Sequence, residues 1–316
     1  RQHYDIKPET IRWMKQGVFQ DDNVLLGVAF RCGLQRNVIP FFNNGVPVEY
    51  ELARSITSVA KEKKKKLGVL KTDAEIGGGF DMQRMSPRPK QAILDELAHQ
   101  YVIEDADPNA SLLDKEYDVL LAVQPSSLNP TQMENFIAAV EAGIPTAIFE
   151  DPAPNFIPST TGTDQQKRPR GGGMFGQQQP PEQKGDIRKL FKILGINFVG
   201  DKVEGKDNAE IIWQHGMPYP KAGTRNFPDQ FVFVTKDQKP LGDNVLDPFN
   251  PKHPIVAGMH EVLLPFPGAI QDESAKGVTF TPLLVTGQIN NQIYVPRDGT
   301  PLAATRLSNR VAPSTQ

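Results

Sequence analysis

The chain has 316 residues, of which 38% are hydrophobic and 23% are charged, and its formal net charge at pH 7 is −2. This length allows one elaborated α/β domain with a sizeable core, and the small net charge gives no reason to expect nucleic acid or an anionic membrane surface as a partner. The single cysteine, Cys32, excludes an intramolecular disulfide and a multi-cysteine metal cluster.

The first part of the chain is polar. It starts at Arg1 without an initiator methionine or signal peptide, and we interpret it as an excised segment of a longer protein. Residues 1–22 read as a lead-in with one weak helical stretch, Glu9 to Gln16. The apolar runs Val24 to Phe30 and Asn37 to Phe42 predict a hairpin, and both are far shorter than the roughly 20 residues of a membrane helix.

A helix and a basic run come next. Glu49 to Lys61 has helical spacing, with Leu52, Ile56 and Val59 or Ala60 on one side. The lysines at 61 and 63–66 precede a strand at Leu67 to Leu70. We interpret them as cations at a helix C-terminus, because no aromatic residue interleaves them as a nucleic-acid platform requires.

Two β-α-β units are predicted. Lys90 to Gln100 carries Ile93, Leu94, Leu97 and Ala98 on one face and leads into a strand at Tyr101 to Glu104. Tyr117 to Pro152 contains the second unit, in which the buried strands Val119 to Val123 and Thr146 to Phe149 flank a helix. Its signals are the N-cap Asn129, Pro130, the capping-box Gln132, an inward stripe of Met133, Phe136, Ile137 and Val140, and the C′ residue Gly143.

The segment from Asn155 to Lys184 has a different composition, rich in Thr, Gln, Pro and Gly. Such a sequence buries little apolar surface, which predicts a mobile loop projecting from the sheet that is dispensable for folding. A basic RNA-contacting tract at Lys167, Arg168 and Arg170 is the weaker alternative, because only three cations stand together.

Order is expected to resume at Asp186, a plausible N-cap for a helix that has Ile187, Leu190, Phe191 and Leu194 inward and ends at Gly195. The short β-like pieces that follow are Ile196 to Val199, Glu210 to Trp213, Gln230 to Val234, Val262 to Phe266 and Thr279 to Val285. The last stretch, Asn290 to Gln316, reads as a connection.

These elements together predict one α/β domain over residues 23–290, with an N-terminal hairpin, a low-complexity insertion at 155–184 and a connection at 291–316. Its core is a mainly parallel sheet with helices on both faces, because two strands joined by one helix run parallel. Ligands of such open sheets bind at the carboxyl ends of the strands.

Four stretches carry a family resemblance in their order: ELARSITSVAKEKKKKLGVL, YDVLLAVQPSSLNPTQMENFIAAVEAGIPTAIFEDP, GDIRKLFKILGINF and NPKHPIVAGMHEVLLPFPGAI with VTFTPLLVTG. Together they resemble the auxiliary component of ABC-type transport systems, the GldG-like proteins associated with gliding motility, over about residues 24–287. The family's frequent Gly-Gly at 142–143 is Ala142-Gly143 here, and the Gln/Gly-rich insertion departs further from its pattern.

The resemblance implies a flavodoxin-like or class I glutamine amidotransferase-like fold without enzymatic activity or a cofactor. It also implies a binding or scaffold role beside an ABC permease and ATPase. The domain would lie on the extracytoplasmic, periplasmic side of the cell inner membrane, held there by flanking membrane helices that this segment lacks.

A ligand- or partner-binding site is expected where the loops at Thr72 to Pro89, Gln124 to Asn129 and Asp151 to Asn155 gather at the carboxyl end of the sheet. The loops are polar and Gly-rich, and chemistry is not required of them. The candidate residues are Asp73, Gly77, Gly78, Gly79, Gln124, Ser126, Ser127 and Asp151.

The alternative function is an amidotransferase-like hydrolase or a metal-dependent enzyme. No strand-to-helix nucleophile elbow is present, since Cys32 falls in the N-terminal hairpin and Ser126 and Ser127 lack the glycines of G-x-S-x-G. His253 and His260 are separated by Pro254 and Gly258, which favours turn residues over metal ligands. Asp73, Glu150 and Asp151 could hold Mg²⁺, although acids before Pro or Gly also simply form turns, and the three glycines fit no phosphate-loop pattern.

Overall fold

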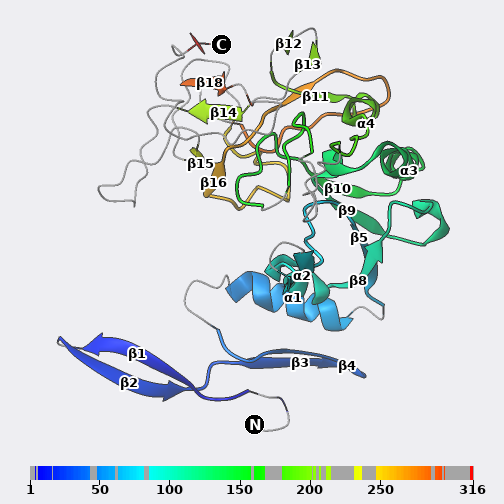
Figure 1. Ribbon diagram of the computed structural model, residues 1–316. Helices are drawn as coiled ribbons and strands as arrows, with labels where there is room; N and C mark the ends of the chain where they lie inside the picture. Colours follow the sequence, from blue (N-terminus) through cyan, green and yellow to red (C-terminus); the bar gives the residue numbers. More distant parts are fainter. Residues whose placement is uncertain are drawn as a thin grey trace.

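The computed structural model (Figure 1) describes residues 4, 6–15, 17–42, 48–60, 63–81, 85–157, 160–167, 180–200, 202–203, 206–207, 211–214, 231–236, 247–285, 289–293, 295 and 314–315. In these residues, a four-stranded parallel sheet with helices lies between N-terminal hairpins on one side and a group of short antiparallel pieces on the other. No helix in the described parts of the chain is both long and apolar enough to cross a membrane.

The central sheet contains β5 (Lys65–Leu70), β8 (Tyr101–Ala106), β9 (Val119–Val123) and β10 (Thr146–Phe149). Their order is β8-β5-β9-β10, and all three pairings are parallel. Numbered along the chain, this is the order 2-1-3-4, with which a flavodoxin-like doubly wound sheet begins. The predicted α/β class and all four predicted core strands are confirmed.

Helices cover both faces of this sheet because its strands are apolar on both faces. Leu120 and Ala122 of β9 join one core cluster with α3 (Pro130–Glu141) and α4 (Ile187–Leu194). Leu121, between them, points to the other face and packs with Leu94 of α2 (Ala92–Ala98). Successive side chains of β9 therefore point to opposite faces of the sheet, and one layer of helices packs on each face.

The β9-α3-β10 unit forms from the local signals in its sequence. The Asn129 side chain accepts the Gln132 N–H at 3.0 Å, and the Gln132 side chain accepts the Asn129 N–H at 3.0 Å, so the capping box is complete. Gly143 has φ +85°, the left-handed conformation that ends the helix. Phe136 is fully buried in the core between α3 and the sheet. The predicted helix and both of its ends are confirmed.

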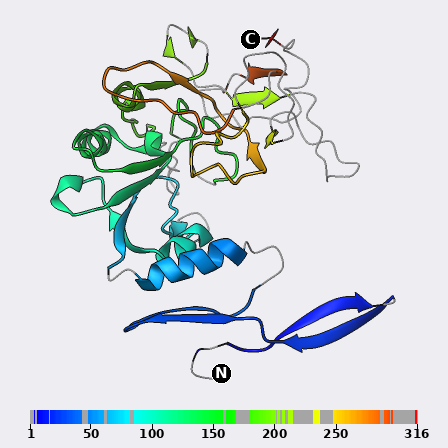
Figure 2. The same cartoon turned by 180° about the vertical axis from the view of Figure 1, so that it is seen from behind.

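The N-terminal residues form strands, so the predicted helix at Glu9 to Gln16 is wrong. β1 (Glu9–Lys15) pairs antiparallel with β2 (Val18–Val24) around Gly17, and the Arg12 and Asp21 side chains meet across the pair at 2.7 Å. Cross-strand pairs of this kind outweighed a weak helical spacing. β3 (Val28–Cys32) and β4 (Gln35–Ile39) form the predicted hairpin. Figures 1 and 2 show both hairpins on the far side of α1 from the sheet.

Helix α1 (Val48–Ala60) lies where predicted, but the predicted inward faces of α1 and α2 are only partly right. Ile56, Ile93 and Ala98 are exposed, because these two helices lean on each other and on the β3–β4 hairpin as well as on the sheet. The lysine run also differs from its interpretation. Lys65 and Lys66 belong to β5, whereas the Lys64 ammonium donates to the Ala98 carbonyl at the C-terminus of α2, 2.9 Å away.

The remaining elements are short. They are β6 (Gly79–Asp81), β7 (Ser86–Arg88), the 3₁₀ turns η2 (Leu112–Asp114) and η3 (Pro125–Ser127), β11 (Ile196–Phe198), β12 (Lys202–Val203), β13 (Lys206–Asp207), β14 (Ile211–Gln214), β15 (Phe231–Thr235), β16 (Glu261–Pro265), β17 (Ile270–Asp272), β18 (Ile289–Ile293) and β19 (Ser314–Thr315). Their pairings are antiparallel: β6 with β7, β11 with β17, β12 with β13, β15 with β16, and β18 with both β14 and β19.

Two expectations for the C-terminal half are wrong. Thr279 to Val285 is not a strand, since it makes a single bridge between Leu284 and Phe249. Residues 290–293, predicted to begin a connection, belong instead to β18, the middle strand of a three-stranded sheet. Backbone pairing with partners far along the chain formed this strand, although its sequence has few apolar residues.

Candidate functional site

The switch point of the sheet lies between β5 and β9, where the chain order reverses. Here the loops that follow the two strands are bonded to each other. The Thr72 hydroxyl donates to the Val123 carbonyl at 2.5 Å, and the Asp73 N–H donates to the Ser127 hydroxyl at 3.0 Å. The structure thus brings Asp73 and Ser127 together, as expected of loops that gather at one edge.

The switch-point crevice is filled by the chain itself. The Thr160 hydroxyl donates to the Asp73 carbonyl at 3.1 Å, and the buried Lys167 ammonium lies 3.0 Å from the Asp73 carboxylate and 3.2 Å from that of Glu182. The expectation of a projecting loop is therefore wrong for residues 160–167 and 180–184, which pack on the sheet edge. Arg168 and Arg170, with the rest of 168–179, lie outside the described residues.

Gln124 is the centre of a buried hydrogen-bond network just past β9. Its backbone is left-handed (φ 55°, ψ 53°), and its side chain is 1% exposed. The side-chain nitrogen lies 2.8 Å from a Glu150 carboxylate oxygen and 3.0 Å from the Thr161 carbonyl, while the side-chain oxygen accepts the Asp151 N–H at 3.1 Å. This side chain connects β9, β10 and the 160–163 segment through hydrogen bonds, and both of its polar atoms are hydrogen-bonded within the protein.

Glu150, directly after β10, is the acid of this network. It accepts the Ser126 N–H at 3.0 Å and the Thr163 hydroxyl at 2.8 Å. Burial raises the pKa of Glu150, although the hydrogen bonds from Ser126 and the nearby Lys184 charge act in the opposite direction. Ser126 and Ser127 are buried, so both serine side chains serve this internal network.

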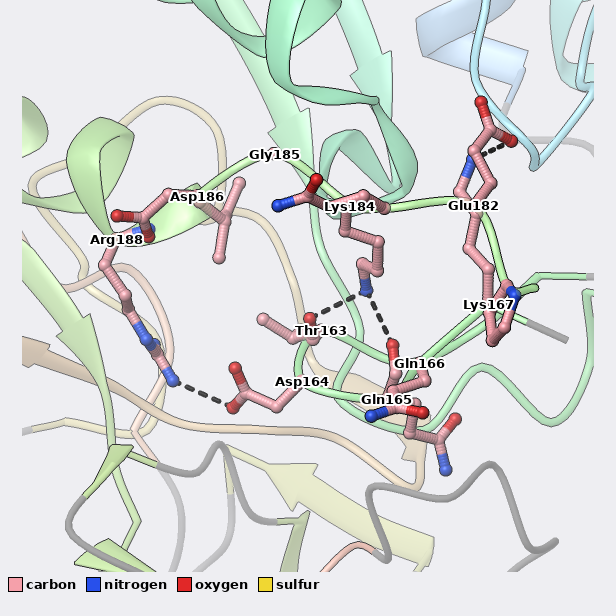
Figure 3. A pocket seen from close by; sticks show the side chains of 13 residues that line it. Thr163, Asp164, Gln165, Gln166, Lys167, Glu182, Lys184, Gly185, Asp186 and Arg188 are labelled. Carbon is pink, nitrogen blue, oxygen red and sulfur yellow. Dashed lines mark hydrogen bonds and ion pairs between the residues drawn. The ribbon is translucent and has the colours of Figure 1, made fainter.

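Lys184 is the cation whose charge acts on Glu150. Figure 3 shows its side chain pointing toward the segment from Thr163 to Gln166. Its ammonium donates to the carbonyls of Gly162 and Thr163 at 2.8 Å and to that of Gln165 at 3.1 Å. Burial lowers the pKa of Lys184 to about 8 in spite of the charges of Glu150 and Asp164. Three carbonyls around one ammonium fix the shape of the 162–165 turn.

The cavity in Figure 3, about 440 Å³ in volume, lies between this turn and the start of α4. Two ion pairs lie in its lining. The Arg188 guanidinium lies 2.8 Å from the Asp164 carboxylate, and Lys167 pairs with Glu182. The polar lining of this cavity therefore holds the insertion against α4.

A second cavity, of about 460 Å³, lies along β10 and is called here the Asp151 cavity. Its walls come from β10, the end of α4, β11 and the β16–β17 segment, and they are mostly apolar. Gln124, Glu150, Asp151 and Asn197 provide its polar lining. Burial raises the pKa of Asp151 to about 6, opposed only by the hydrogen bond that its carboxylate accepts from the Ala153 N–H at 2.7 Å.

The three candidate glycines lie at a different cavity. Gly77, Gly78 and Gly79 line a space of about 270 Å³ beside the ends of β5 and β8, together with Glu75 and Asp105. Gly78 has φ +89°, and a side chain there would lie 3.0 Å from the Arg88 carbonyl, so the turn that precedes β6 itself requires glycine. The predicted single crevice is thus divided, with Asp73 and the serines in its closed middle.

Two of the residues weighed for the enzyme alternative lie outside the loops of this edge. Cys32 is exposed in the β3–β4 hairpin, and the His253 ring accepts the Ile255 N–H at 3.4 Å within a turn. Within the described ranges, no three His, Cys, Asp or Glu side chains are grouped so that they could hold a metal ion.

Four residues of the network were missed by sequence reasoning: Thr161, Thr163, Lys167 and Lys184. All belong to a segment whose average composition suggests disorder. The position of Lys184 could have indicated its role, because it lies two residues before Asp186, the N-cap of α4. A residue so close to a helix start is held near the folded core.

The chain was compared with known families and proteins. A family model described as an ABC-type uncharacterized transport system matches residues 64–311, which is most of the chain and includes the sheet and the whole candidate site. No curated protein and no solved structure matches the chain.

Proposed function

The chain belongs to the ABC-type uncharacterized transport system family, as an auxiliary component, and we propose that it serves there as a non-catalytic binding or scaffold domain. The observation that carries the proposal is the internal pairing at the carboxyl edge of the sheet. Where a doubly wound enzyme exposes reactive groups, Gln124, Glu150 and Lys184 hydrogen-bond to the chain itself. One of the cavities that stay open at this edge is mostly apolar, which suits binding.

The proposed partners are the permease and ATPase subunits of the transporter, with the domain on the extracytoplasmic side of the inner membrane and flanking helices in the bilayer. The resemblance to GldG-like proteins supports this placement and a link to gliding motility. A contact surface is supported by Phe149 at the edge strand β10, whose side chain is 62% exposed beside the Asp151 cavity. Large exposed aromatic side chains are typical anchors of protein interfaces.

Photo-cross-linking in cells tests the proposal. The full-length protein would carry a photoreactive phenylalanine at Phe149 or, as the control, at Val102, which is 44% exposed on the opposite edge strand β8. We expect Phe149 to capture the permease subunit, which the domain can reach from the extracytoplasmic side, and Val102 not to capture it. Equal capture from both positions would contradict a contact at this edge. Reproducible hydrolysis of an amide, ester or nucleotide by the purified protein would support the hydrolase alternative.

A further inference from the structure

The Asp151 cavity has the dimensions and lining of a small-molecule site. Its volume of about 460 Å³ lies within the usual range of ligand pockets, about 300–1,000 Å³. Apolar side chains from four elements enclose it, among them Ile148 of β10, Leu194 of α4, Phe198 of β11 and Ile270 of β17. It therefore lies where the parallel sheet meets the antiparallel C-terminal pieces (Figure 1), and such junctions are frequent binding sites.

Of the two acids that line the cavity, Glu150 belongs to the buried hydrogen-bond network and the Asp151 carboxylate does not. The side chains of Gln124 and Glu150 hydrogen-bond within the buried network, whereas the Asp151 carboxylate accepts one hydrogen bond, from the Ala153 N–H. Other acids at this edge have cations, as Asp73 has Lys167 and Asp164 has Arg188. Among the residues that the structure describes, no Lys, Arg or His lies within ion-pair distance of Asp151. Within this part of the chain, its mostly buried carboxylate therefore has no countercharge.

We infer that the Asp151 cavity binds a small molecule with an apolar body and an ammonium group, with the ammonium at the Asp151 carboxylate and the body against Leu194, Phe198 and Ile270. The inference rests on the proposed binding role and names the class of ligand. A cation replaces the water that burial removes from the carboxylate, and a charge-assisted hydrogen bond is stronger than a neutral one. Burial raises the pKa of Asp151, as it does for a carboxylate whose counterion is absent.

The test uses three probes with the same apolar body: hexylammonium, 1-hexanol and hexanoate, each titrated calorimetrically into the full chain at pH 8. We expect hexylammonium to bind about ten- to a hundred-fold more tightly than hexanol, and hexanoate to bind most weakly. Equal affinity for the three probes, or no binding of hexylammonium, would overturn the inference.

Two variants, Asp151→Asn and Ile270→Trp, locate the site, and a third variant, Asp105→Asn, is the matched control. Asp151→Asn keeps the shape and should remove the preference for hexylammonium over hexanol. Ile270→Trp, at an exposed wall residue, should weaken both probes at least tenfold by filling the cavity. Asp105→Asn removes a carboxylate at the same sheet edge that lines the other cavity, and it should leave all affinities within twofold. An equal loss in Asp105→Asn and Asp151→Asn would refute the assignment.

The binding experiment tests the ligand class and the cross-linking experiment tests the contact role, so the two can fail separately. If hexylammonium does not bind but Phe149 still cross-links to a transporter subunit, the ligand class is wrong and the contact role stands. If hexylammonium binds with the predicted preference but no subunit is captured, the ligand site stands and the contact role does not.

Discussion

Replacing the buried acid Asp151 with Asn should stabilise the protein at neutral and alkaline pH but not at acidic pH. Burial raises the pKa of this carboxyl from its ordinary value of 3.8 to about 6, so the folded state disfavours the charged form. Below pH 3.8 both the folded and unfolded states are protonated, and burial carries no penalty. As the pH rises toward 6 the unfolded state ionises first, so stability falls, and above about pH 6 the loss is complete.

The size of the stability penalty follows from the rise in the pKa of Asp151. About two pKa units at 1.36 kcal/mol each give a penalty of up to about 3 kcal/mol at pH 8. Asn keeps an oxygen that can accept the Ala153 N–H, now 2.7 Å from the Asp151 carboxylate, so little else is lost. We therefore expect Asp151→Asn to raise the free energy of unfolding by about 1–3 kcal/mol at pH 8 and by only about 0.5 kcal/mol at pH 4.

Urea unfolding of both proteins at the two pH values measures this difference. Asp105→Asn is the control, because the Asp105 side chain is largely exposed beside Lys71, and it should change stability by less than about 0.5 kcal/mol at either pH. The reasoning fails if Asp151→Asn destabilises the protein at pH 8, or if its effect is the same at pH 4.

Three further predictions follow from the buried residues. Phe136→Ala should lower the free energy of unfolding by about 3–5 kcal/mol in a denaturant melt, because the ring is 0% exposed between α3 and the sheet; a loss below about 1 kcal/mol would contradict that packing. Gln124→Leu should cost about 2–4 kcal/mol in the same assay, since it leaves the Thr161 carbonyl and the Asp151 N–H without partners; unchanged stability would show that water replaces the amide. Wild-type stability should gain a contribution as the pH rises from about 8 toward 10.5, because the unfolded state still holds the Lys184 proton that the folded state has lost; Lys184→Met should remove this slope, and identical pH profiles would refute the burial of the ammonium.

The β9-α3-β10 unit could be predicted in detail because every signal in it is local. The Asn129–Gln132 capping box and the left-handed Gly143 each act within a few residues, so a single sequence specifies both helix ends. The buried runs of β5 and β9 likewise identify strands covered on both faces.

Elements that depend on distant partners could not be predicted in this way. β1 has a weak helical spacing, and only its pairing with β2 makes it a strand. β18 has few apolar residues and exists because it joins β14 and β19. Backbone hydrogen bonds between segments far apart in the chain leave little trace in local sequence.

The gathering of the candidate loops could be predicted, whereas the packing of the 160–167 segment between them could not. The loops of Asp73, Gln124 and Asp151 do gather at the carboxyl ends of the strands, as the doubly wound topology requires. Sequence composition could not show that Thr160 and Lys167 of the insertion fill the middle of this edge. That packing depends on single buried contacts, which an average over a polar segment hides.

The affinity of the full-length protein for the permease–ATPase complex proposed as its partner tests the central claim, contact rather than turnover, most directly. We predict that Phe149→Ser weakens this affinity at least about tenfold, that Val102→Ser leaves it unchanged, and that both variants keep the wild-type fold by circular dichroism. Undiminished affinity in Phe149→Ser, together with reproducible hydrolysis of an amide, ester or nucleotide by the protein alone, would contradict the account.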